Sequence, residues 1–113
     1  MRAWLLLGAA ALALVIAFAI AVVAGADGPQ PARYEIAMRA FAFEPGVLEA
    51  NAGDTLVWIN HDVVPHTATS GEGGIDSGLV APGASWSFVV PAVAHLAYSC
   101  LFHPTMTGTI SVR

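Results

Sequence analysis

The sequence predicts an all-β sandwich that is preceded by one apolar N-terminal helix. Three observations favour this fold class. After an uncharged run from Ala3 to Ala26, the chain consists of short stretches in which apolar residues alternate with polar ones or follow one another without interruption. Turn-forming residues separate these stretches. No spacing of apolar residues typical of a helix continues for three turns. The residues after the apolar run are enough for one domain around a single core.

The N-terminal segment directs export. Arg2 precedes the apolar run, which exceeds a signal-peptide core of roughly 7 to 15 residues and suffices for a bilayer-spanning helix of about 20. However, Ala24-Gly25-Ala26 is an acceptable cleavage site for a signal peptide. We therefore expect residues 1–26 to be either a signal peptide or an N-terminal membrane anchor. Both alternatives place the folded domain outside the cytoplasm, in the periplasm or on the outer face of the cytoplasmic membrane.

The remaining chain divides into a linker at residues 27–32, rich in proline and glycine, and a folded domain at residues 33–113. Alternation predicts a first strand from Tyr34 that continues through Phe43 until Pro45-Gly46. Residues 55–60 are nearly all apolar, which is typical of a central strand buried on both sides. Further strands are expected at residues 47–50, 85–90, 95–100 and 107–112. The order of strands and turns predicts an antiparallel sandwich.

The charge of the domain excludes one class of partner. From Asp27 onward there are three arginines, no lysine and eight acidic residues. An acidic surface without a basic cluster repels phosphate backbones, so nucleic-acid binding has no electrostatic basis. A basic protein partner is favoured instead.

One short segment carries metal-binding chemistry. Cys100 is the single cysteine, so it cannot form an internal disulfide, and His103 and Met106 follow it within one loop. Two imidazoles and a thiolate, with a weak axial thioether, are the ligands of blue copper electron-transfer sites. The second imidazole must come from elsewhere, and His66, fixed by the preceding Pro65, is the natural candidate.

Each of these residues alone has a simpler interpretation. An isolated cysteine is most often a small buried hydrophobe, an isolated methionine is core packing, and an isolated histidine is a surface or hydrogen-bonded residue. A Cys-x-x-His-x-x-Met spacing at a strand end, with a Pro-His pair upstream, outweighs these interpretations. His61 and His95 are expected to be surface residues, and Trp58 and Trp86 to be core or capping residues.

The chain resembles the cupredoxins and is most similar to the amicyanin and plastocyanin group. The resemblance covers nearly all of residues 33–113 and rests on six segments: Phe43-Glu44-Pro45, residues 53–62, Pro65-His66-Thr67, Asp76-Ser77-Gly78, Ala81-Pro82-Gly83 and residues 100–110. It implies a Greek-key β-sandwich that holds one type 1 copper ion, with the metal ligands His66, Cys100, His103 and Met106. It also implies an electron port at His103, with a partner patch formed by Pro65, Pro104 and Thr105.

Residues that contact the metal ligands without binding the metal would adjust the reduction potential of this site. We expect Asn60, Thr67 and Phe102 in this role. The sequence departs from the amicyanin pattern at Thr67, where amicyanin has asparagine, and at Phe102, where it has proline. Because phenylalanine has a backbone N–H, we hypothesise that Phe102 donates a second hydrogen bond to the Cys100 sulfur and raises the reduction potential.

The predicted function is one-electron transfer between redox partners, such as a cytochrome or a membrane electron-transfer complex, by a monomeric domain. Two alternatives stay open: a copper protein for storage or delivery, and a metal-free structural β-sandwich. Catalysis is disfavoured, because copper oxidases and nitrite reductases add further copper centres and this chain has no His-x-His pair to build one.

Overall fold

The computed structural model describes residues 15–17 and 30–113. The apolar helix expected within residues 1–26 and the start of the linker fall mainly outside these ranges. Within them, no helix combines the length and apolar character needed to cross a membrane.

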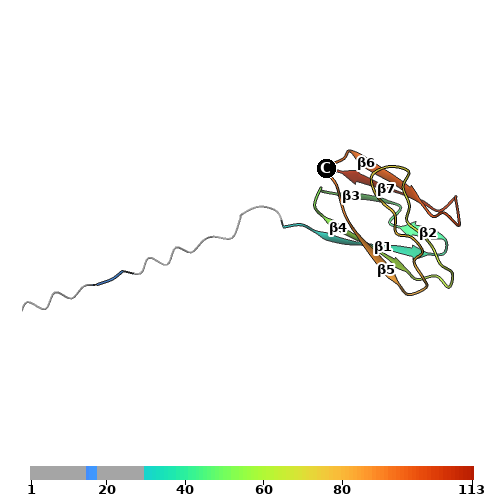
Figure 1. The fold of residues 1–113 in the computed structure, drawn as a ribbon, viewed down its shortest axis with the longest axis horizontal. Coiled ribbons are helices and arrows are strands. Elements are labelled where there is room, and N and C mark those ends of the chain that lie inside the picture. Colours follow the sequence, from blue (N-terminus) through green and yellow to red (C-terminus); the bar gives the residue numbers. More distant parts are fainter. Residues whose placement is uncertain (1–14, 18–29) are drawn as a thin grey trace, which may run out of the picture.

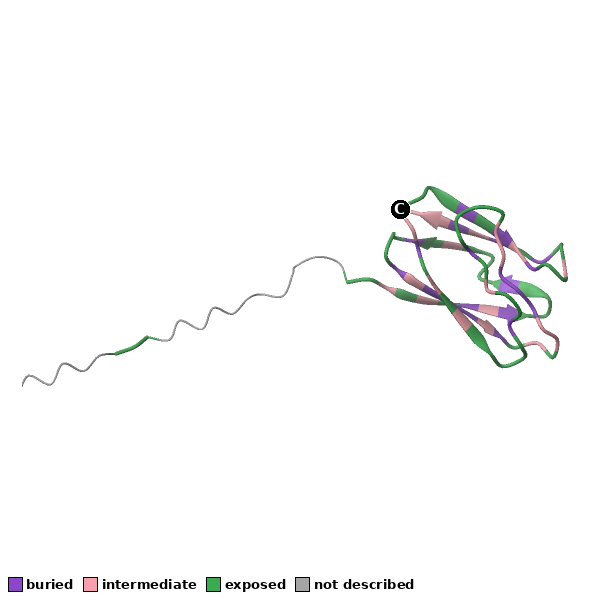
Figure 2. Cartoon of the chain, in the orientation of Figure 1, coloured by how far each residue is buried: buried purple, intermediate pink, exposed green. Residues whose placement is uncertain are grey.

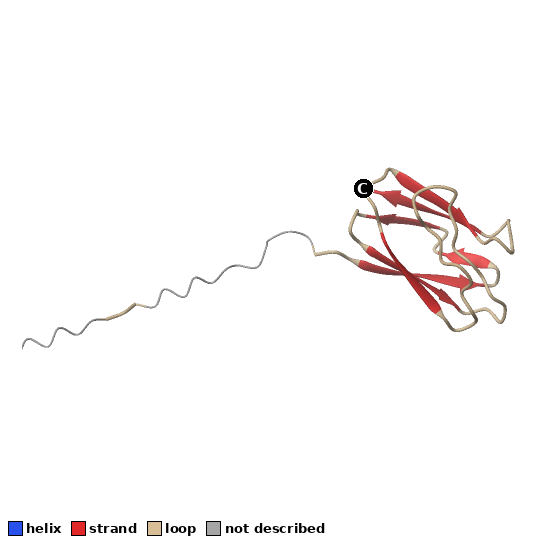
Figure 3. Ribbon diagram, viewed as in Figure 1, coloured by secondary structure: helices blue, strands red, loops and turns tan. Residues whose placement is uncertain are grey.

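Among the described residues, seven strands form two facing sheets (Figures 1 and 3). One sheet has the order β2-β1-β4-β5 and the other the order β3-β7-β6. The strands are β1 (Arg33–Arg39), β2 (Ala42–Glu44), β3 (Val47–Ala50), β4 (Thr55–Asn60), β5 (Ser85–Val89), β6 (His95–Ser99) and β7 (Thr107–Val112). The expectation of an all-β sandwich is confirmed.

The core lies between the sheets, where buried segments of the strands face one another (Figure 2). Strand β4 is central in its sheet, and Leu56, Val57 and Trp58 are all buried, as its apolar sequence predicted. Trp58 contacts Trp86 on β5 and Tyr98 on β6, with ring centroids 5.5 and 5.3 Å away. The aromatic side chains therefore join the two sheets.

The expected first strand is interrupted, so the prediction of one strand through Phe43 is wrong. Ala40 and Phe41 adopt φ values of 50° and 58°, in the left-handed region, and turn the chain so that β2 folds back antiparallel to β1. Alternating side chains on either side of a tight turn resemble one continuous strand in the sequence. The alternation alone could not reveal the turn.

The purely antiparallel arrangement is also wrong. Strand β1 pairs with β4 in parallel, and β3 pairs with β7 in parallel. The other three ladders are antiparallel. Both parallel pairs join strands that are not consecutive, which is the consequence of connections that cross between the two sheets.

The topology brings two loops together at one end of the sandwich. Strand β4 ends at Asn60 and leads into the loop of residues 61–84, while β6 ends at Ser99 and leads into the loop of residues 100–106. Thr69 in the first loop forms a bridge with Ser99. In contrast, Arg33 pairs with Thr55 at the opposite end, where β1 begins (Figure 1).

Candidate metal centre

His66 is held rigidly within the loop of residues 61–84. Its backbone exchanges two hydrogen bonds with Val80: the His66 N–H donates to the Val80 carbonyl at 3.1 Å, and the Val80 N–H donates to the His66 carbonyl at 2.8 Å. The side chain is fully buried. A two-residue bridge of this kind fixes the direction of the imidazole at the end of the sandwich.

The second loop presents the other three predicted ligands. The Cys100 N–H donates to the Met106 carbonyl at 3.0 Å, and the Met106 N–H donates to the His103 carbonyl at 2.9 Å. Cys100 and Met106 are buried, whereas His103 is half-buried. The loop therefore points its thiol and thioether residues inward and keeps its imidazole next to the surface.

Three donor atoms converge between the loops. The Cys100 Sγ lies 3.8 Å from the His66 Nδ1 and 3.6 Å from the His103 Nδ1. The ligand atoms of these three residues all lie within 4.8 Å of one another. The arrangement brings together the histidine and cysteine positions that the sequence singled out.

The chemistry of this donor set fits copper. A thiolate with two imidazoles and a weak thioether suits a copper ion that cycles between Cu(II) and Cu(I). Thr67 donates its backbone N–H to the Cys100 Sγ at 3.3 Å, which supports a sulfur that carries negative charge. Burial of the thiol also protects it from solvent.

Two of the expected outer-shell residues hold the ligand loops in place. Asn60 is buried and donates from its side-chain amide to the carbonyls of Val64 and Val80. The Thr67 Oγ1 accepts the Leu101 N–H at 2.9 Å and lies 2.9 Å from the Thr69 Oγ1. Thr67 therefore connects the two ligand loops through both its backbone and its hydroxyl group.

The expected bond from Phe102 to the Cys100 sulfur is not formed. In residues 30–113, the backbone donor to this sulfur is Thr67. Phe102 lies at the surface, with 53% of its area exposed. The expected effect of Phe102 on the reduction potential stays a prediction.

Sequence reasoning missed Asp62, which contacts a predicted ligand. Its Oδ2 lies 2.7 Å from the His66 Nε2, and its carboxylate also accepts the N–H groups of Ala40 and Phe41. Partial burial opposes ionisation, but the hydrogen bonds from Phe41, His66 and Ala40 outweigh it and lower the pKa of Asp62 below its usual value. A carboxylate four residues before a histidine ligand was the only sequence signal, and many spacings of that kind are accidental.

Phe41 was also missed as a neighbour of the site. Its ring lies edge-on to both imidazoles, with centroids 5.6 Å from His66 and 4.8 Å from His103. It is 53% exposed, and Leu101 and Phe102 are exposed as well. Of the predicted patch residues, Pro65 is half-buried, while Pro104 and Thr105 are exposed.

The remaining histidines and tryptophans lie where the sequence suggested. His61 and His95 are exposed, Trp58 is fully buried, and Trp86 is half-buried beside it. Neither exposed histidine belongs to the group of candidate metal ligands found among the described residues.

Comparison with known proteins identifies one relative that is similar in sequence and several solved structures that are similar in fold. No protein-family model matches the chain. Plastocyanin from Scenedesmus fuscus is 32% identical over 87 residues, which cover 66% of this chain and 89% of the relative. Amicyanin from Paracoccus versutus has a TM-score of 0.66 at 22% identity, over 77% of this chain and 86% of amicyanin. The copper-containing nitrite reductase of Thermus scotoductus has the same TM-score at 25% identity, over 76% of this chain but 23% of the reductase.

Proposed function

The chain belongs to the plastocyanin-like cupredoxins, and we propose that its copper ion is held by the four residues His66, Cys100, His103 and Met106. As a member of this family, the protein is a type 1 copper protein that carries single electrons and is not an enzyme. The observation that carries the ligand assignment is the convergence of two Nδ1 atoms and one Sγ within 4.8 Å. In this assignment Met106 would supply a weakly bound thioether sulfur.

Rigid positioning is the main contribution of the protein. Bound copper supplies a one-electron couple between Cu(II) and Cu(I). The two backbone bonds between His66 and Val80, together with the bonds that close the loop from Cys100 to Met106, hold the donor atoms in one arrangement. A site that does not rearrange suits both oxidation states, because each electron then moves without rebuilding its surroundings.

His103 is the proposed electron port. It is the half-buried ligand, and the Phe41 ring lies 4.8 Å from it between centroids. Pro65, Pro104 and Thr105, with the exposed side chains of Phe41 and Phe102, would form the apolar partner patch beside it. A redox protein docked on this patch would approach the imidazole edge.

The partners follow from charge and from export. The acidic domain favours a basic redox protein, such as a cytochrome or a membrane electron-transfer complex. We place the protein in the periplasm or on the outer face of the cytoplasmic membrane, with residues 1–26 as signal or anchor and residues 27–32 as linker. Arg33, where the folded domain begins, lies at the end of β1 opposite the site.

Metal retention during redox cycling tests this function. The full chain, loaded with Cu(II), is reduced with ascorbate and reoxidised with ferricyanide over repeated cycles in the presence of a copper chelator. An electron carrier should keep its copper and recover its visible absorbance in every cycle. If the chelator removes the copper during the first cycles, the protein serves storage or delivery and the proposal is wrong.

A further inference from the structure

Asp62 occupies an unusual position, because one carboxylate joins a metal ligand to a separate strand connection. Its Oδ2 lies 2.7 Å from the His66 Nε2, its Oδ1 accepts the Ala40 N–H at 2.7 Å, and its Oδ2 accepts the Phe41 N–H at 3.0 Å. The Asp62 side chain is only 13% exposed. Its own N–H donates to the Asn60 Oδ1 at 2.9 Å, which fixes the backbone from which it extends.

The contact with His66 determines which ring nitrogen is free. An ionised carboxylate only accepts hydrogen bonds, so the His66 Nε2 must carry the proton in this contact. The Nδ1 of the neutral ring then keeps its lone pair, and this is the atom that faces the Cys100 sulfur at 3.8 Å. Asp62 thereby selects the tautomer that a metal requires.

The contact with the strand connection places an aromatic ring over the site. Ala40 and Phe41 are both in the left-handed region, a conformation that L-residues adopt only when the surroundings enforce it. The two hydrogen bonds to Asp62 supply this constraint. The turn then holds the Phe41 ring edge-on to both imidazoles, at 5.6 and 4.8 Å between centroids.

We propose that Asp62 is a positioning residue of the metal centre, which fixes the tautomer and orientation of His66 and seats Phe41 over both histidines. This inference rests on the proposed function, and it assigns a role to a carboxylate that contacts a ligand but does not bind the metal. Its negative charge favours the more positive Cu(II) state. The carboxylate therefore lowers the reduction potential as well as orienting the ring.

The first test uses the metal-free full chain. Long-range ¹⁵N–¹H spectra of the His66 ring distinguish the two tautomers. We expect a single tautomer with the proton on Nε2 in the wild type and a mixture in Asp62→Ala. Circular dichroism establishes that the variant is folded, and if it is not, Asp62→Leu, which has a similar shape and no acceptor, takes its place. An unchanged tautomer in a folded variant would overturn the proposal.

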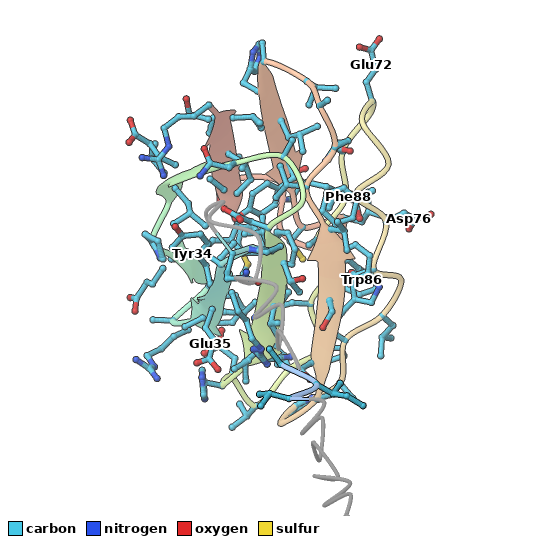
Figure 4. The ribbon with its side chains drawn as sticks, turned by 90° about the vertical axis from the view of Figure 1, so that its left-hand side faces the viewer. Tyr34, Glu35, Glu72, Asp76, Trp86 and Phe88 are labelled. Carbon is cyan, nitrogen blue, oxygen red and sulfur yellow. The ribbon has the colours of Figure 1, made fainter. Side chains whose placement is uncertain are left out.

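The second test uses the copper-loaded chain. Asp62→Asn removes the charge with little change in shape, and Asp76→Asn makes the same change at an exposed loop residue that projects into solvent (Figure 4). We expect Asp62→Asn to favour Cu(I) by about tenfold, which corresponds to roughly 59 mV for a one-electron couple. Asp76→Asn should shift the potential by less than a third of that value.

The two tests separate the positioning role from the copper function. Equal shifts of the reduction potential in Asp62→Asn and Asp76→Asn would show that Asp62 acts only as a surface charge, and would overturn the proposal. If the chain binds no copper, the proposed function fails, but the tautomer of His66 in the metal-free chain still decides whether Asp62 positions it.

Discussion

At the scale of single residues, Thr67 shows how one side chain couples the two ligand loops. Its hydroxyl accepts the Leu101 N–H, and its backbone donates to the Cys100 sulfur. Thr67→Val keeps the shape and the backbone donor but leaves the Leu101 N–H without its acceptor. We expect a loss of about 1 to 3 kcal/mol in the free energy of unfolding, measured with denaturant. Thr107→Val, at an exposed position, is the control and should change stability by less than about 0.5 kcal/mol.

Tyr98 gives the fold a predictable dependence on alkaline pH. Burial raises the pKa of its phenol from 10.0 to about 12, although the neighbouring Trp58 indole opposes the shift. The folded state therefore holds the phenolic proton more tightly than the unfolded state. The resulting stability is fully present below pH 10 and is lost as the pH rises from 10 through about 12.

Stability measured across this pH range checks the effect of Tyr98. The free energy of unfolding of the wild type should fall between pH 10 and 12. In Tyr98→Phe this part of the loss should disappear, because the variant has no buried phenol to ionise. Equal losses of stability in the two proteins would contradict the assignment.

The sequence predicted the four proposed ligands because their residue types are chemically unusual together. A lone cysteine, two histidines and a methionine rarely share these spacings in a chain that binds no metal. Asp62 and Phe41 could not be found in the same way, because their role depends on a turn that brings residues 40 and 41 against the loop after β4. The hydrogen bond expected from Phe102 could not be derived from the sequence, because an available N–H does not determine its own direction, and the backbone donor to the Cys100 sulfur is Thr67.

At the scale of elements, the pair of β6 and β7 requires a glycine. Gly108 lies opposite Tyr98, and a Cβ atom at Gly108 would lie 2.3 Å from the Tyr98 Cζ and 2.4 Å from its hydroxyl oxygen. We expect Gly108→Ala to lower the free energy of unfolding by about 1 to 3 kcal/mol, because the ring or the strand must shift. Gly71→Ala is the control, since its Cβ would meet nothing within 4 Å. Equal denaturation midpoints would contradict this account.

The strands themselves were largely predictable, but their partners were not. Alternation located β1, β5, β6 and β7, and the continuous apolar run located β4 at the centre of its sheet. The same patterns carry no information about pairing direction, so the two parallel ladders were missed. The turn at Ala40 and Phe41 was hidden because neither residue is a typical left-handed one.

At the scale of the whole molecule, charge should control encounters with partners. The domain at residues 33–113 carries seven acidic residues against three arginines, so its attraction to a basic cytochrome weakens as salt screens the charges. Stopped-flow rates of electron transfer to a basic cytochrome should fall steadily as ionic strength rises. Rates to an acidic cytochrome should rise instead. A rate independent of salt for both partners would show that the apolar patch alone governs docking.

The central claim is that Cys100 and two histidines bind copper as a type 1 site, and the visible spectrum tests it most directly. The full chain is mixed with Cu(II), and the spectrum is recorded beside that of Cys100→Ala. A thiolate bound to Cu(II) produces an intense charge-transfer band that makes the protein blue. We predict that the wild type shows this band, that ascorbate bleaches it, and that Cys100→Ala lacks it. A colourless wild type, or a blue colour that survives in Cys100→Ala, would contradict the assignment.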